Sequence, residues 1–358
     1  MTLVLALALT ACSGEDESPE SDETPSADSS VPSDPSGGTG SEPADPSDPK
    51  TNILDWEKGE VANDTAIAGA KVDMLVPEGG AEARLTGVGQ DGKTVIPAGK
   101  NRQITDAFIG STHAVVVAQD KQETKPQVVT LVDLETGKTS TVDDPSPGSG
   151  GPWAMNGSTL AYATYSPGSD YCLATYDVDA RTGEKGFCAE KGHGFSNVSV
   201  TPHGTTLMSF DNKRPVSCRT LLAVSGEKST PVEGVPDCTG WEAVATADGH
   251  VWSSLPNENQ IERGEFHATV EGKTYDLGAG AASTLTWCGD SAYFTRDSGK
   301  GRPAQMLRWT PEHTLEIVYE SPGKGQAFLS PPTCSESVLS VSAYGQGGDE
   351  RVTATVPG

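Results

Sequence analysis

The sequence has 358 residues, with 50 acidic residues against 25 basic ones, and it contains 41 glycines and 25 prolines. That length suits one large domain or two ordinary ones, and so many turn-forming residues are typical of a β-rich protein. A formal net charge of −25 argues against binding to nucleic acid, whose phosphates attract basic proteins.

The first twelve residues, MTLVLALALTAC, contain a short apolar run from Leu3 to Leu9. The run is too short to cross a bilayer as a helix and fits the core of a secretory signal peptide. The four residues that end at Cys12, Leu-Thr-Ala-Cys, resemble the lipobox of bacterial lipoproteins. The resemblance implies that Cys12 is lipidated and holds the protein at the extracytoplasmic face of the cell membrane. Because no basic residue precedes Leu3, we expect the true start of translation to lie upstream.

Residues 13–50 form an acidic segment with eleven acidic residues, one lysine and seven prolines. Almost none of these side chains can enter a core, so the segment predicts a disordered tether. Like charges and prolines favour extension, and the stretched segment would reach about 120 Å. An acidic tether does not adhere to anionic lipid, so the remaining domain, residues 51–358, would be attached through the lipid alone.

A turn glycine recurs through this domain at intervals of 45, 46, 43 and 46 residues. The glycines are Gly92, Gly137, Gly183, Gly226 and Gly272. Each stands between two strand-like runs, so each predicts a hairpin turn. The first copy lies in GVGQDGKT (87–94), which matches the phosphate-binding loop of nucleotide hydrolases. Val95, Ile96 and Pro97 follow where a helix is required, so we expect a hairpin and no bound nucleotide.

A second repeated unit consists of a short strand, a polar turn and an apolar strand, and it occurs seven times at intervals of about 41 to 46 residues. With the glycine hairpins it gives four strands per repeat, so the sequence predicts an all-β fold, a seven-bladed β-propeller with four antiparallel strands per blade. The copy VTPHGTTLMSF, in which His203 replaces the usual aspartate, resembles an element of TolB-type propellers, which are related to WD40-like repeats. NILDWEKGEV (52–61) is a spare strand, and we expect it to close the last blade.

Six cysteines remain after Cys12, and an even count in an exported chain predicts disulfides. The register of the repeats pairs cysteines on adjoining strands in blades 3 and 4, and pairs the last two between blades 6 and 7. The predicted bridges are Cys172–Cys188, Cys218–Cys238 and Cys288–Cys334. A zinc site is the alternative, but no close C-x-x-C pair occurs, and we expect neither a metal nor a cofactor.

Candidate ligand residues fall at both ends of the predicted blades. The starts of the first strands carry Trp153 and Trp241, with the carboxylates of Asp106 and Glu242, a set that fits sugar binding or acid–base chemistry. Packing between blades is the simpler role for both tryptophans. The loops between second and third strands are basic and predict a docking face for an anionic partner. Its predicted residues are Lys213, Arg214, Arg263, Lys300 and Arg302.

The pattern as a whole resembles envelope lipoproteins of high-GC Gram-positive bacteria. It implies a non-enzymatic lipoprotein whose propeller is a rigid platform for an envelope protein or a cell-wall polymer. The alternative is a hydrolase or lyase that acts on polysaccharide at the mouth of the central channel. That enzyme requires Asp106 and Glu242 to converge in an open, solvated pocket, and a channel plugged by large side chains argues against it.

Overall fold

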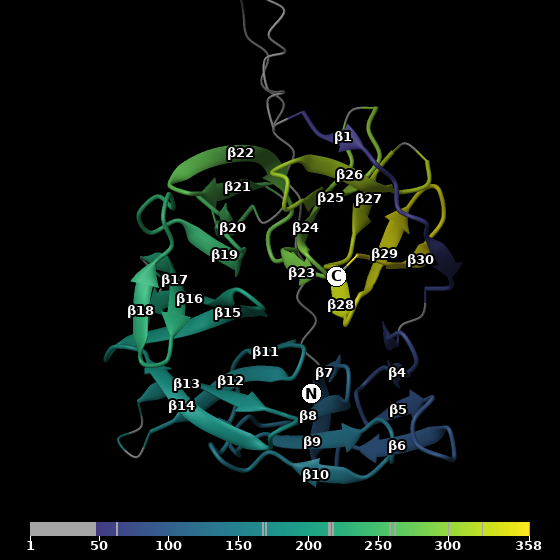
Figure 1. Ribbon diagram of the computed structural model, residues 1–358, viewed down its shortest axis with the longest axis vertical. Helices are drawn as coiled ribbons and strands as arrows, with labels where there is room; N and C mark the ends of the chain where they lie inside the picture. The colour runs from purple at the N-terminus through teal and green to yellow at the C-terminus, as the bar shows by residue number, and fades with distance from the viewer. Residues whose placement is uncertain are drawn as a thin grey trace, which may run out of the picture. The chain divides into compact units, whose positions relative to one another are not determined.

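The computed structural model describes residues 48–357, except 62, 63, 167, 169, 214, 215, 217, 258, 261, 262, 300 and 324. These residues form seven sheets, each built on antiparallel strands, that are arranged as the blades of a ring (Figure 1). The first five blades each use four consecutive strands, as the repeat predicts. Within the described ranges no helix is long and apolar enough to cross a bilayer.

The strands of the first four blades pair in the order in which they follow one another along the chain. Blade 1 is β3 (Thr65–Ala68), β4 (Asp73–Val76), β5 (Glu82–Thr86) and β6 (Lys93–Pro97). Blade 2 is β7 (Arg102–Ile109), β8 (His113–Asp120), β9 (Val128–Asp133) and β10 (Thr139–Thr141). Blade 3 is β11 (Trp153–Asn156), β12 (Thr159–Tyr165), β13 (Tyr171–Asp177) and β14 (Thr182–Cys188). Blade 4 is β15 (His193–Thr201), β16 (Gly204–Asp211), β17 (Arg219–Ser225) and β18 (Lys228–Pro231).

Blade 5 is β19 (Gly240–Ala245), β20 (Gly249–Ser254), β21 (Gly264–Val270) and β22 (Lys273–Gly280). Blade 6 is β23 (Thr286–Cys288), β24 (Ser291–Arg296), β25 (Gln305–Trp309) and β26 (Leu315–Glu320). Blade 7 is β27 (Ala327–Leu329), β28 (Thr333–Ser335), β29 (Val338–Gly345) and β30 (Glu350–Thr355). Both β27 and β28 pair with β29, so the first strand of blade 7 is split around Pro331 and Pro332, which cannot donate to the ladder.

The N-terminal part of the propeller closes the ring, as predicted. Strand β2 (Glu57–Gly59) pairs antiparallel with β30 and supplies the fourth strand of blade 7. Just before it, β1 (Lys50–Thr51) pairs parallel with β26 of blade 6, a contact that the repeat pattern does not predict. Trp56, between the two strands, donates its indole N–H to the carbonyl of Val318 at 2.8 Å. The segment from β1 to β2 therefore contacts both blade 6 and blade 7 and connects them.

Apolar side chains form a separate cluster between each pair of consecutive blades from 1 to 7. Second strands lie in the middle of the blades and are covered on both faces, which explains why every residue of β8 (HAVVVAQD) is buried. Between blades 7 and 1 the structure has instead a pocket of about 520 Å³ with many polar lining residues. There the side chain of Arg351 donates to the carbonyl of Ala66 at 2.7 Å.

The glycine turns confirm the hairpin interpretation of the repeat. Gly92 has φ +67° and lies between β5 and β6, so the apparent phosphate loop is a connection between antiparallel strands. One copy differs from the prediction: Gly183 lies within β14, and Arg181 (φ 55°) takes the left-handed position in the turn. The turn of blade 3 therefore comes two positions before the glycine.

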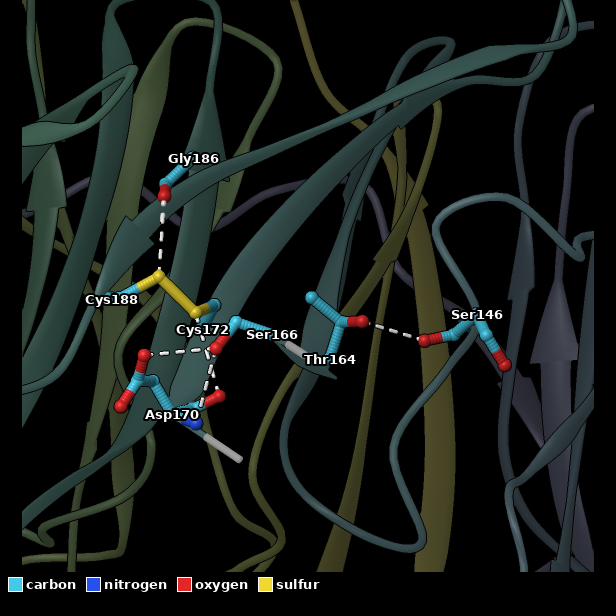
Figure 2. The surroundings of a disulfide bond; sticks show 7 residues. All are labelled: Ser146, Thr164, Ser166, Asp170, Cys172, Gly186 and Cys188. Atoms are coloured by element: carbon cyan, nitrogen blue, oxygen red, sulfur yellow. Dashed lines mark hydrogen bonds between the residues drawn. A yellow bond between two sulfur atoms is a disulfide. The ribbon is translucent and has the colours of Figure 1, made fainter. Parts of the chain in front are cut away.

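The three disulfides link the predicted cysteines. Cys172 and Cys188 lie opposite each other on β13 and β14, and Figure 2 shows the bridge beside the hydrogen bond from Ser166 to Asp170. Cys218 directly precedes β17, but Cys238 lies in the connection to blade 5 rather than at the end of a fourth strand.

The third bridge, Cys288–Cys334, joins the first strands of blades 6 and 7. It therefore fixes these two blades near the ring closure, as predicted.

Candidate functional site

A groove of about 630 Å³ lies across blades 5, 6 and 7, which are neighbours in the ring (Figure 1). It opens on the face formed by the loops between second and third strands, where the sequence predicted a docking surface. Its lining comprises Arg263, Ala279, Gly280, Arg296, Asp297, Ser298, Arg302, Gln326, Ala327, Phe328, Tyr344 and Gly345. We call this the arginine groove, since three arginines from two blades line it.

Arg296 ends β24 and is held in place by the backbone of the neighbouring blade. Its Nε donates to the carbonyl of Ala279 at 2.7 Å, and its Nη2 donates to that of Leu277 at 3.1 Å. Burial and the nearby charge of Arg302 lower the pKa of Arg296, and Asp276 opposes them. Arginine nevertheless stays protonated in proteins, so two like charges are held close together in the groove.

Arg302 and Arg263 are the two predicted docking residues that the groove brings together. Arg302 is exposed and closes a tight turn in which its backbone exchanges two hydrogen bonds with Gly299, at 3.1 and 3.2 Å. Arg263 contacts the side-chain oxygen of Gln260, at 3.5 Å. Among the described residues, no carboxylate forms an ion pair with any of the three arginines. Their charge is therefore available to an anionic ligand.

An aromatic pair from blade 7 forms another wall of the groove. Phe328 on β27 lies opposite Tyr344 on β29, and their rings stack with centroids 5.0 Å apart and an interplanar angle of 19°. Phe328 is 54% exposed, so its ring is accessible to a ligand. A flat exposed ring face beside guanidinium groups can bind a ligand that carries both anionic groups and ring faces.

The remaining predicted docking residues lie elsewhere or outside the described residues. Lys213 is 3.4 Å from the carboxylate of Asp211 on blade 4. Arg214 and Lys300 fall outside the described residues, as does Cys12.

Both predicted tryptophans make intramolecular contacts. Trp153 is buried between blades 2 and 3, stacks on Tyr162 at 4.7 Å, and donates its N–H to Gln127 at 3.0 Å. Its packing role is thereby confirmed. Trp241 is half-buried, donates to the hydroxyl of Ser283 at 2.9 Å, and does not line the arginine groove.

Glu242 stabilises the interface between blades 5 and 6. One carboxylate oxygen accepts from the backbone N–H of Ser283 (2.8 Å) and the hydroxyl of Ser253 (3.2 Å), and the other accepts from the N–H of Leu285 (3.1 Å). Burial raises the pKa of Glu242 to about 7, and these hydrogen bonds counteract it. Glu242 is only 7% exposed, so it is not the solvated group that the enzyme alternative requires.

Asp106 lies on β7 of blade 2, three blades away from Glu242. Burial raises its pKa, and a hydrogen bond from Thr105 counteracts this. The two carboxylates therefore belong to separate blades.

The turns between first and second strands meet on the other face of the ring, where Trp287 occupies a central place. This side chain, from β23, lines one pocket shared with blades 2, 3 and 7 and another shared with blades 4 and 5. It is 8% exposed. Trp287 therefore lines both pockets of this face, which is opposite the face where the first strands that carry Asp106 and Glu242 begin.

The sequence did not predict three charged or aromatic residues of the arginine groove: Arg296, Phe328 and Tyr344. Arg296 is the last residue of an apolar strand, so the search for basic residues in the loops did not include it. Phe328 and Tyr344 alternate with buried residues and resemble ordinary strand positions. Only the pairing of β27 with β29 brings them together. Within the described ranges, no group of three or more metal-binding side chains was found.

No protein-family model and no curated protein matches the chain. Among solved structures it is similar to the β-propeller domain of the Trilobed protease from Pyrococcus furiosus, which is described as having an open velcro topology. That match has a TM-score of 0.54 and 10% identity over 81% of this chain and 95% of the other. The likeness shows the propeller fold and no activity.

Two weaker matches have TM-scores too low to support an argument. TolB from Acinetobacter baumannii matches with a TM-score of 0.38 and 12% identity, over 82% of this chain and 79% of that one. An oligogalacturonate lyase in complex with manganese matches with a TM-score of 0.44 and 11% identity, over 80% and 74%.

Proposed function

We propose that this protein is a lipid-anchored lipoprotein of the extracytoplasmic cell surface, whose propeller binds an anionic partner in the arginine groove. The observation that carries the proposal is the grouping of Arg263, Arg296 and Arg302, which pair with no described carboxylate, beside the exposed ring of Phe328. Anchoring through Cys12 is the expectation from the lipobox-like sequence. The partner would then be a component of the cell envelope.

An anionic cell-wall polymer is the partner class that fits the groove best. Guanidinium groups bind carboxylates and phosphates in a planar, two-pronged geometry. The stacked pair of Phe328 and Tyr344 offers an apolar face to a sugar ring. An acidic envelope protein would use the arginines but has less need of the aromatic wall.

A polysaccharide hydrolase or lyase remains the alternative, but no observation favours it. Asp297 is the only acid among the described residues that line the groove, whereas glycoside hydrolysis ordinarily needs a pair of carboxylates. A rigid binding site is therefore the function that the geometry supports.

The test compares two charge-matched variants of the full chain. Arg263→Gln/Arg302→Gln removes two positive charges from the groove, and Lys93→Gln/Lys138→Gln removes two from hairpins of blades 1 and 2. Polygalacturonate is the probe, with dextran as the neutral control and polyglutamate as an acidic polypeptide. We expect the groove variant to lose about tenfold or more in affinity for polygalacturonate, and the control variant to be unchanged.

Binding should also weaken as salt rises above physiological strength, since screening acts within about 8 Å. Equal losses in both variants, or binding of dextran as tight as that of polygalacturonate, would contradict the proposal. Binding of polyglutamate alone would identify an acidic protein as the partner class.

A further inference from the structure

A second pocket, of about 250 Å³, lies on the opposite face of the ring and is lined by blades 4, 5 and 6. It is formed by His203, Thr246, Ala247, Asp248, Trp287, Asp290, Trp309, Thr310, Pro311 and His313. Pockets for drug-sized ligands start at about 300 Å³, so this one suits a smaller group. We call it the aromatic pocket.

Four of the lining side chains are aromatic rings, and they are packed against one another. Trp309, which is 3% exposed, stacks with His313 at a centroid distance of 5.9 Å and an interplanar angle of 16°. Trp287 meets the ring of His203 edge to face at 5.4 Å. Both tryptophans belong to the apolar cluster between blades 5 and 6, so the pocket wall is held rigidly.

The charges around the pocket are acidic. Asp248 and Asp290 line it, and no lysine or arginine does so among the described residues. The carboxylate of Asp248 contacts Nε2 of His313 at 2.6 Å, which joins a turn of blade 5 to a turn of blade 6. Although burial opposes it, the hydrogen bonds from His313 and Thr246 lower the pKa of Asp248, so this group is ionised at neutral pH.

Tryptophan faces attract cations through the ring quadrupole, and aromatic pockets with a nearby carboxylate recognise quaternary ammonium groups. We propose that the aromatic pocket binds a small quaternary ammonium group such as the trimethylammonium head of choline. An anionic ligand is disfavoured by the two carboxylates. A strongly hydrated cation such as ammonium gains less, because it must give up its water to enter an apolar pocket.

This site differs from the arginine groove in face, charge and ligand, and the two proposals stand independently. The aromatic pocket uses the turns between first and second strands and between β25 and β26, whereas the groove uses the loops between second and third strands. No described residue lines both.

The experiment is a titration of the intact protein with choline chloride at pH 8. Binding is measured by tryptophan fluorescence and by calorimetry. The matched ligand is 3,3-dimethyl-1-butanol, which has the shape of choline without its charge. We expect saturable binding of choline that is about tenfold tighter than that of the alcohol, a ratio equivalent to about 1.4 kcal/mol. Equal affinity for both ligands, or no binding of choline, would overturn the proposal.

Two variants locate the site. Asp248→Asn/Asp290→Asn removes the charge at the aromatic pocket and should weaken choline binding severalfold while leaving the affinity for the alcohol unchanged. Asp179→Asn is the control, because Asp179 forms the equivalent aspartate–histidine contact with His113, at 3.4 Å, between blades 2 and 3. If Asp179→Asn weakens choline binding as much as the pocket variant, choline does not bind at this pocket.

A parallel titration with phosphatidylcholine vesicles distinguishes a free ligand from a lipid head group. Vesicle binding that Asp248→Asn/Asp290→Asn weakens indicates a head group that reaches the pocket. Binding of choline without vesicle binding indicates a soluble ligand. Either result supports recognition of the trimethylammonium group.

Discussion

Glu242 shows how a single polar side chain supports a ring of apolar interfaces. A buried carboxylate costs free energy unless hydrogen-bond donors surround it. Ser283 and Leu285 on the next blade supply two backbone donors, so the side chain connects blades 5 and 6. In the sequence this glutamate resembled a catalytic acid, because its position in the repeat does not show whether it faces the channel or the neighbouring blade.

We predict that Glu242 makes the stability of the propeller fall with rising pH. Its pKa is about 7 in the folded protein, against an ordinary value of 4.5. Between these values the folded state binds a proton that the unfolded state does not, so the free energy of unfolding decreases as pH rises through this window. Between pH 5 and pH 8, the wild type should lose about 2 to 3 kcal/mol more than Glu242→Gln.

Urea unfolding of both proteins at the two pH values measures this difference. Other titrating groups are shared by the two proteins and cancel in the comparison. Identical changes in stability would show that the carboxylate is already ionised at pH 5.

The closing segment shows what individual strands contribute. β2 pairs through only three residues, Glu57 to Gly59, but it covers the edge that β30 would otherwise expose. Asn52 and Leu54 also donate backbone hydrogen bonds to the carbonyls of Ile317 and Val318, at 2.9 and 3.1 Å. The segment from Asn52 to Gly59 therefore both covers the edge of blade 7 and attaches this blade to blade 6.

We predict that deletion of residues 52–61 destabilises the propeller by several kcal/mol. The deletion removes the fourth strand of blade 7 and the contact of Trp56 with Tyr319, whose rings are 5.5 Å apart. Deletion of residues 13–47 is the control and should leave the urea midpoint unchanged. Hydrogen exchange should report faster exchange in β30 after the first deletion alone. If the protein that lacks residues 52–61 is as stable as the control, the segment is only a linker and does not stabilise the propeller.

The closing strand could be predicted from sequence because the repeat leaves an incomplete last blade and a spare strand at the start. The cysteine pairs could be predicted for the same reason, since a repeat turns sequence position into spatial position. The pairing of β1 with β26 could not, because two residues carry no periodic signal. The aromatic wall of the arginine groove was also beyond the sequence, since Phe328 and Tyr344 meet only through the split first strand of blade 7.

The ring as a whole has six interfaces filled by apolar clusters and one, between blades 7 and 1, that contains a polar pocket. The closing segment and the Cys288–Cys334 bridge both act beside this seam. Closing an unfolded loop of this bridge's length, 46 residues, corresponds to about 4 kcal/mol of stability. Strand β2 ties the start of the propeller to blade 7, and the bridge links blade 7 to blade 6, so blade 7, which borders this seam, is held by both.

Attachment to the membrane concerns the entire chain, and we predict that it depends on Cys12. Cys12→Ser should move the protein from the membrane fraction to the medium without a change in thermal unfolding, because Cys12 takes part in none of the three bridges. The double variant Cys172→Ser/Cys188→Ser is the control. It should remain in the membrane fraction but lose about 3 kcal/mol of stability. A Cys12→Ser protein that stays with the membrane would contradict a lipid anchor at this residue.

The pairing of β2 with β30 also constrains when the ring can close during folding. Lys58 and Glu350, which form an ion pair across these strands, are 292 positions apart in the chain. Contacts between such distant residues carry a large entropic cost of loop closure, and folds rich in them fold slowly. During synthesis, β2 leaves the ribosome long before its partner exists. The ring therefore cannot close before its last blade is made, and β2 has no β30 to pair with until then.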